Sequence, residues 1–104
     1  MGFVVKGKYD ESSKSIVDNW ISKVLLPQKT INTKRTGYGL KHVLQADTGV
    51  YLYTEEFKRA MLANGFESKP AEYSFGENDY NFNVKTRLQQ YHGIKVDSSF
   101  NIGG

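Results

Sequence analysis

TGYGLKHVLQADTGVYLYTEEFKRAMLANGF, residues 36–66, is the stretch that decides the fold, because it contains two predicted helices and the connector between them. Thr36 can cap the first of these helices, since a threonine side chain accepts a hydrogen bond from the first helical turn. Gly37 and Gly39 would each weaken a helix interior, so they predict a turn before it. The Asp-Thr-Gly sequence at 47–49 ends the helix, and 50–53 follow as a short strand or extended connector.

The second helix of this stretch is predicted over residues 55–64, with Thr54 as its cap. Its first turn carries two acidic residues, Glu55 and Glu56. Negative charge is favourable at this end of a helix because of the helix dipole. The Asn-Gly pair at 64–65 predicts the end of the helix, with Phe66 folding back on the last turn as in a Schellman motif.

Towards the N-terminus, apolar residues repeat with helical spacing over residues 13–26. They form one stripe, Ile16, Val17, Trp20, Ile21, Val24 and Leu25. Pro27 ends this helix because its ring clashes with the preceding turn. Residues 27–35 are polar and lack periodicity, which predicts an exposed connector, and the apolar run at 3–5 predicts a short strand or packed arm.

Towards the C-terminus, the apolar period falls to two, which is typical of strands. The alternating residues are Tyr73 and Phe75, then Tyr80, Phe82 and Val84, with turn-forming residues between them. This pattern predicts a β-hairpin with an aromatic face that belongs to the core or, alternatively, stacks single-stranded bases. A short helix from Asn83 to Tyr91 and a strand over 94–96 are expected next.

These elements predict an α+β fold with a compact three-helix core and a C-terminal β-hairpin. The element order is that of a winged-helix domain, in which the third helix lies in a DNA major groove and the hairpin contacts the backbone nearby. We expect a single winged-helix-like domain over residues 1–97 and a flexible C-terminal tail over 98–104.

Composition excludes several function classes. The 104-residue chain has no cysteine, which excludes disulfides, thiolate zinc sites and cysteine nucleophiles. His42 and His92 have no partner at metal-ligand spacing, and no nucleophile elbow is present. No apolar run approaches the roughly 20 residues that span a bilayer. We therefore expect a soluble, cytoplasmic protein that is not an enzyme and has neither cofactor nor membrane partner.

Charge distribution indicates a binding role. The net charge is +3, and no acidic residue occurs between Asp18 and Asp47. The predicted nucleic-acid contacts are Lys29, Lys34, Arg35, Lys41, Lys58 and Arg59. Each could equally be a solvated surface charge. The alternative is a protein-binding surface composed of Tyr51, Tyr53, Glu55, Glu56, Glu77 and Asp79. These acidic residues would oppose the approach of a phosphate backbone.

A longer pattern covers roughly residues 30–85. It begins with the YGLKH sequence at 38–42 and continues through Asp47, Gly49, Tyr51, Phe57, Ala60, Met61, Gly65, Phe66, Phe82, Asn83 and Val84. The pattern resembles small proteins of bacterial phages, prophages and conjugative elements. This resemblance implies a mobile-element protein in a bacterial host cell. Its partner would be nucleic acid or a host nucleoprotein effector. In the second case the protein would be an anti-CRISPR-type inhibitor and the effector its target.

Overall fold

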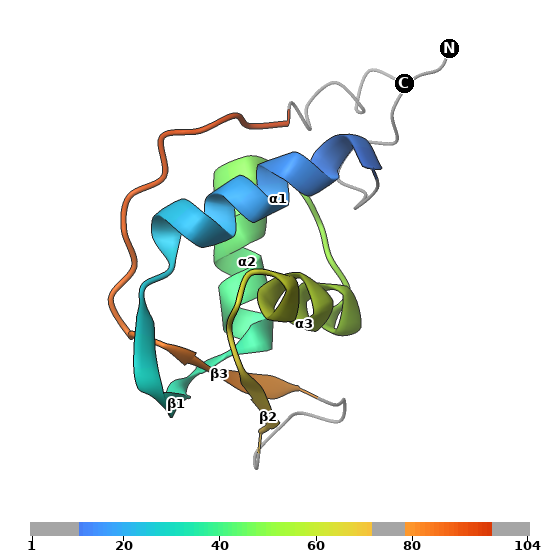
Figure 1. Ribbon diagram of the computed structural model, residues 1–104. Helices are drawn as coiled ribbons and strands as arrows, with labels where there is room; N and C mark the ends of the chain where they lie inside the picture. The colour runs from blue at the N-terminus through green and yellow to red at the C-terminus, as the bar shows by residue number, and fades with distance from the viewer. Residues whose placement is uncertain (1–10, 72–78, 97–104) are drawn as a thin grey trace.

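A computed structural model describes residues 11–71 and 79–96, which form an α+β fold (Figure 1). The elements, in chain order, are α1 (Glu11–Val24), β1 (Pro27–Thr36), α2 (Gly37–Thr48), α3 (Thr54–Ala63), β2 (Ser68–Pro70) and β3 (Tyr80–Val84). The strands form an antiparallel sheet in the order β1-β3-β2. In Figure 1 the helices lie above this sheet, so the core lies between the two layers.

The core combines the helices with β3. The predicted stripe of α1 is buried from Val17 to Leu25, and Trp20 is fully buried within it. Phe57 of α3 and Phe82 of β3 are also fully buried, and their rings meet edge to face with centroids 5.6 Å apart. Buried aromatic side chains of this size contribute much of a small domain's hydrophobic stabilisation. The helices therefore share their core with the sheet, and the burial of Phe82 agrees with the expectation that the aromatic face of the hairpin belongs to the core.

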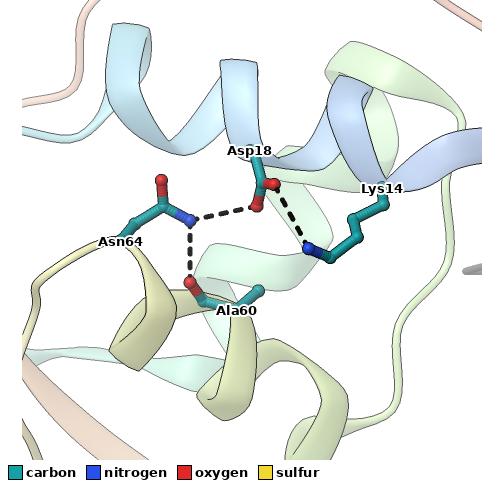
Figure 2. A network of polar contacts seen from close by, with 4 residues as sticks. All are labelled: Lys14, Asp18, Ala60 and Asn64. Carbon is teal, nitrogen blue, oxygen red and sulfur yellow. Dashed lines mark hydrogen bonds and ion pairs between the residues drawn. The ribbon is translucent and has the colours of Figure 1, made fainter. Parts of the chain in front are cut away.

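Polar contacts fix α1 against the other helices. The Trp20 indole donates a hydrogen bond of 2.8 Å to the Asp47 carboxylate of α2. Figure 2 shows the corresponding link to α3, in which the Asn64 side-chain amide donates to Asp18 at 3.1 Å and to the Ala60 carbonyl at 2.8 Å. Lys14 lies 4.0 Å from the Asp18 carboxylate. Asn64 thus both satisfies the end of α3 and positions it against α1.

The N-terminus of α2 confirms the predicted cap and corrects the predicted turn. Thr36 accepts a hydrogen bond of 3.1 Å from the Gly39 N–H. Gly37 and Gly39 lie inside α2 and do not precede it. Gly37 lies at a close approach, because a Cβ there would be 3.0 Å from the Asp79 carboxylate and 3.4 Å from the Phe82 ring. Its missing side chain lets β3 pack against the start of α2.

Both glycines that were predicted to end helices do so in the structure. Gly49 ends α2 with φ of 82°, and Gly65 follows α3 with φ of 90°. The Phe66 N–H donates to the Met61 carbonyl at 3.0 Å, and the Gly65 N–H donates to the Leu62 carbonyl at 3.0 Å. This is the hydrogen-bond pattern of a Schellman motif. The predicted end of α3 is therefore confirmed, including the burial of Phe66.

β1 corrects the prediction that residues 27–35 are a connector. Its pairing with β3 is irregular, with register shifts on both sides of Asn32, so the sequence lacks the alternation of a regular strand. Asn32 is buried and donates to the Val84 carbonyl at 2.8 Å and to the Thr86 hydroxyl at 2.9 Å. Its own side-chain oxygen accepts from the Lys34 N–H at 2.8 Å. A polar side chain therefore supports this strand.

The hairpin is formed by β2 and β3, with Ser68 opposite Phe82 and Pro70 opposite Tyr80. The predicted first strand at Tyr73 and Phe75 lies outside the described residues. The same applies to the run at 3–5, to Glu77 and to the tail at 98–104.

Residues 85–96, here called the C-terminal strap, correct the predicted final helix and strand, because they form neither. The strap leaves β3 and passes over α1 (Figure 1). Its N–H groups donate to the carbonyls of Leu26, Val24 and Thr48 at 2.7, 2.8 and 2.6 Å. Carbonyls at a helix C-terminus have no partner inside the helix, so the strap satisfies that of Val24 at the end of α1 and that of Thr48 at the end of α2. Leu88, Tyr91 and Val96 pack against the core.

Candidate nucleic-acid interface

α3 presents one stripe of side chains away from the core. Its inner face consists of Phe57, Ala60 and Met61, all buried. The outer stripe consists of Glu55, Lys58, Arg59 and Leu62, at the spacing of one helix face. Leu62 is 47% exposed, near the C-terminal end of this stripe. The outer stripe is therefore a surface available for contact.

Tyr80 of β3 ties this stripe to the sheet. Its hydroxyl donates a hydrogen bond to the Glu55 carboxylate and accepts one of 3.4 Å from the Lys58 ammonium. The same ammonium lies 4.5 Å from the Tyr80 ring centroid and 3.4 Å from the Glu55 carboxylate. The hydrogen bond from Tyr80, followed by the effects of Lys58, lowers the pKa of Glu55. The hydrogen bond to Tyr80 raises the pKa of Lys58. Both groups therefore favour their charged forms and partly neutralise each other.

Two further acidic residues of the predicted protein-binding set have structural roles. The Asp79 carboxylate accepts hydrogen bonds from the N–H groups of Tyr38 at 3.1 Å and Tyr80 at 2.7 Å. It therefore satisfies an N–H group in the first turn of α2. Glu56 accepts a hydrogen bond of 2.9 Å from the Tyr53 N–H. Tyr53 is accordingly the N-cap of α3, in place of the predicted Thr54.

The predicted basic contacts lie on three elements. Lys29 and Lys34 are exposed on β1, and the Arg35 guanidinium donates to the Thr86 carbonyl at 2.9 Å through Nε. Lys58 and Arg59 lie on the outer stripe of α3. Lys41, on α2, is only 8% exposed. The fold thus places an exposed pair on β1 and the Lys58–Arg59 pair on α3, with Lys41 folded inward.

An exposed aromatic surface surrounds Lys41. We name Tyr38, Tyr51 and Tyr53 the tyrosine cluster; they are 58%, 40% and 66% exposed. The rings of Tyr51 and Tyr53 meet edge to face with centroids 5.4 Å apart. Tyr38 meets the His42 ring in the same way at 4.4 Å. The Lys41 ammonium lies 5.0 Å from the Tyr51 centroid and 5.8 Å from the Tyr38 centroid.

Tyr38 does not belong to the core, although it lies in the helix that supplies Leu40 and Leu44 to it. On α2 the buried face contains Gly37, Leu40 and Leu44. Tyr38 lies two positions from Leu40, about 200° around the helix axis, and so on the opposite face. The spacing of Leu40 and Leu44 alone could have shown this.

A shallow hollow of about 260 Å³ lies where the C-terminal ends of α1 and α3 meet. It is lined by Ile21, Ser22, Leu25, Pro27, Asn64, Gly65 and Phe66, none of which is ionisable. Among residues 11–71 and 79–96, no three acidic or histidine side chains are grouped so that they could hold a metal ion.

In the same residues, no helix combines the length and apolarity needed to cross a membrane. Comparison of the chain with protein-family models, with curated proteins and with solved structures gives no match.

Proposed function

We propose that this protein is a winged-helix-like domain of a mobile genetic element that binds duplex DNA and catalyses no reaction. The observation that carries the proposal is the element order α1-β1-α2-α3-β2-β3 combined with the sheet order β1-β3-β2. In a winged-helix domain, two successive helices with a short connector are followed by a two-stranded hairpin, the wing. Here these parts correspond to α2, α3 and the β2–β3 hairpin.

The outer stripe of α3 supports major-groove docking. In helix-turn-helix proteins the second helix lies in the major groove and its N-terminal residues contact base edges. Arg59 is exposed and forms no ion pair with any described residue. Arginine reads guanine through two hydrogen bonds, so Arg59 is the proposed base contact. Lys58 is the proposed neighbouring phosphate contact.

The roles of the acidic residues support the same proposal. Acidic groups at the start of α3 and at the hairpin would repel phosphate if they were free. Glu55 is paired with Lys58 and Tyr80, while Glu56 and Asp79 accept backbone hydrogen bonds at the starts of α3 and α2. Glu56 and Asp79 thus serve to cap helices, and Glu55 serves to pair with Lys58 and Tyr80. The basic pair Lys29 and Lys34, with Arg35, provides backbone contacts from β1.

Fluorescence anisotropy with labelled duplex DNA, at low and physiological salt, tests the proposal. Arg59→Gln should weaken binding about 5- to 100-fold, because one bidentate base contact is lost. Lys29→Gln and Lys34→Gln should each lower the slope of log affinity against log salt by about 0.9. Lys23→Gln, on an exposed residue at the end of α1, is the matched control and should leave binding unchanged. Absence of duplex binding at low salt would refute the proposal.

A second candidate function is inhibition of a host defence complex by protein contact, as anti-CRISPR proteins do. The exposure of Tyr51 and Tyr53 favours it, because aromatic residues dominate interface hot spots. Production of the protein in a host that targets a phage should then protect the phage. Replacement of Tyr51 and Tyr53 by Ala should abolish protection while leaving the thermal unfolding midpoint nearly unchanged. Full targeting in the presence of the wild-type protein would exclude this function.

A further inference from the structure

The tyrosine cluster has three hydroxyl groups that form no hydrogen bond with the described residues. Within residues 11–71 and 79–96, no side chain or backbone group bonds to the hydroxyls of Tyr38, Tyr51 or Tyr53, whereas those of Tyr80 and Tyr91 are bonded to Glu55 and Ile94. Exposed tyrosines present an apolar ring and one hydrogen-bonding group. The three hydroxyls of the cluster are therefore available to a ligand.

Lys41 adds a positive charge beside the rings of Tyr38 and Tyr51. Its side chain is largely withdrawn from solvent, and no carboxylate in the described part of the chain forms an ion pair with it. The rings of Tyr38 and Tyr51 provide a partial compensation through cation–π contact. An anionic group placed on the cluster would be attracted by this charge and would accept hydrogen bonds from the hydroxyls.

The cluster lies where a winged-helix domain would meet a DNA backbone. Tyr38 is in the first turn of α2, and Tyr53 is the residue immediately before α3. The start of α3 is the part that would enter the major groove, with phosphates on both sides of it. Tyr53 therefore lies at the N-terminal end of α3, next to the start of the outer stripe.

We propose that the tyrosine cluster and Lys41 bind backbone phosphates of duplex DNA, the hydroxyls donating hydrogen bonds to phosphate oxygens and the ammonium supplying the charge. This inference rests on the proposed function and assigns a second part of the same surface. Contacts of this kind position a protein on DNA without reading its sequence.

The geometry favours phosphate contact over base stacking. Stacking needs an open ring face. The Lys41 ammonium occupies one side of the Tyr38 and Tyr51 rings, and Tyr51 and Tyr53 stand at an interplanar angle of 83° to each other. The rings therefore form no parallel platform, while their hydroxyl edges remain free.

Replacement of all three tyrosines by phenylalanine isolates the hydroxyls, because the rings and their contacts remain. Duplex affinity should fall about 2- to 10-fold per hydroxyl, with an unchanged salt slope because no charge is removed. Lys41→Met keeps the buried stem and should lower the salt slope by about 0.9. Lys23→Met is the matched charge control and should change neither quantity. Anisotropy on duplex and single-stranded oligonucleotides of equal length provides these values.

The outcomes separate this inference from the proposed function. Duplex binding by the wild type that is unaffected in the phenylalanine variant would overturn the phosphate site and leave the proposed function in place. Base stacking would be shown if the phenylalanine variant binds as tightly as the wild type, a triple alanine variant loses binding, and the wild type prefers single strands. This result would also overturn the phosphate site. A wild type that fails to bind duplex DNA at low salt would overturn both.

Discussion

Gly49 and Gly65 adopt the same left-handed conformation in different surroundings, so alanine at each position tests how the C-terminal strap is held. Their φ angles are 82° and 90°. A Cβ at Gly65 would have no neighbour within 4 Å, but at Gly49 it would lie 2.6 Å from the Val96 carbonyl oxygen. Alanine in this conformation costs about 1–2 kcal/mol at either position. At Gly49 the strap must also move away.

The displacement gives Gly49→Ala an additional cost. Moving Val96 breaks its 2.6 Å hydrogen bond to the Thr48 carbonyl, which contributes about 0.5–1.5 kcal/mol. We therefore expect Gly49→Ala to lower the free energy of unfolding by about 1.5–3.5 kcal/mol, and Gly65→Ala by about 1–2 kcal/mol. In a domain of this size, a difference of 1 kcal/mol shifts the unfolding midpoint by about 4–8 °C.

Urea unfolding followed by tryptophan fluorescence measures both variants. Trp20 is the only tryptophan in the sequence, and it is fully buried, so its emission reports on the core. The free energies of unfolding of the two variants should be compared only if their m-values, the slopes of free energy against urea concentration, are equal. Equal slopes exclude a change in the unfolded state as the cause. Equal losses in the two variants would refute the reasoning, because they would show that the strap does not rest against Gly49.

Three further predictions concern α2 and the outer stripe of α3. Thr36→Val should lower the free energy of unfolding by about 1 kcal/mol in thermal melts, because the α2 cap is lost; Thr33→Val, exposed on β1, is the control. Gly39→Ala should raise stability by about 0.5–1 kcal/mol, since its Cβ would meet only the Thr36 hydroxyl at 3.4 Å. Tyr80→Phe should lower the unfolding midpoint at neutral pH but much less under acid. The pKa of Glu55 is lowered in the folded state from 4.5, so the stability it contributes is present above that pH and lost as the pH falls through the folded pKa. A loss that stays constant under acid would contradict this explanation.

Local signals explain which elements could be predicted from the sequence. The α1 stripe and the Schellman end of α3 depend on residues within a few positions of each other, so periodicity and the Asn-Gly pair were sufficient. The Thr36 cap is local in the same way. These parts of the fold were predicted correctly because their hydrogen bonds and buried faces lie inside single elements.

Long-range contacts explain what was missed. β1 is polar and irregular, and its support comes from Asn32, whose partner Val84 is 52 residues away in the sequence. The strap is held by the carbonyls of Val24, Leu26 and Thr48, which no local pattern reveals. Sequence rules for strands and helices do not contain these partners, so both segments were assigned by composition alone.

On the candidate surface, too, some features could be predicted from the local sequence and others depend on long-range contacts. The basic residues of β1 and α3 could be named from charge, but the inward position of Lys41 depends on Tyr51, which follows α2 in the chain. The acidic residues suggested a repulsive surface, whereas two of them accept backbone hydrogen bonds at the starts of helices. Charge counts therefore located the charged residues along the chain, but not the contacts that the fold gives to each of them.

The pairing of β1 with β3 sets an order of folding. It closes a loop of about 50 residues, which has a high entropic cost, whereas α2 and α3 meet across a short connector. We expect the helices to associate before the transition state of folding, and the pairing between β1 and β3 to form after it. Contacts that form late slow unfolding without speeding folding. The pairing of β1 with β3, supported by Asn32, would thus slow unfolding and determine the lifetime of the native state.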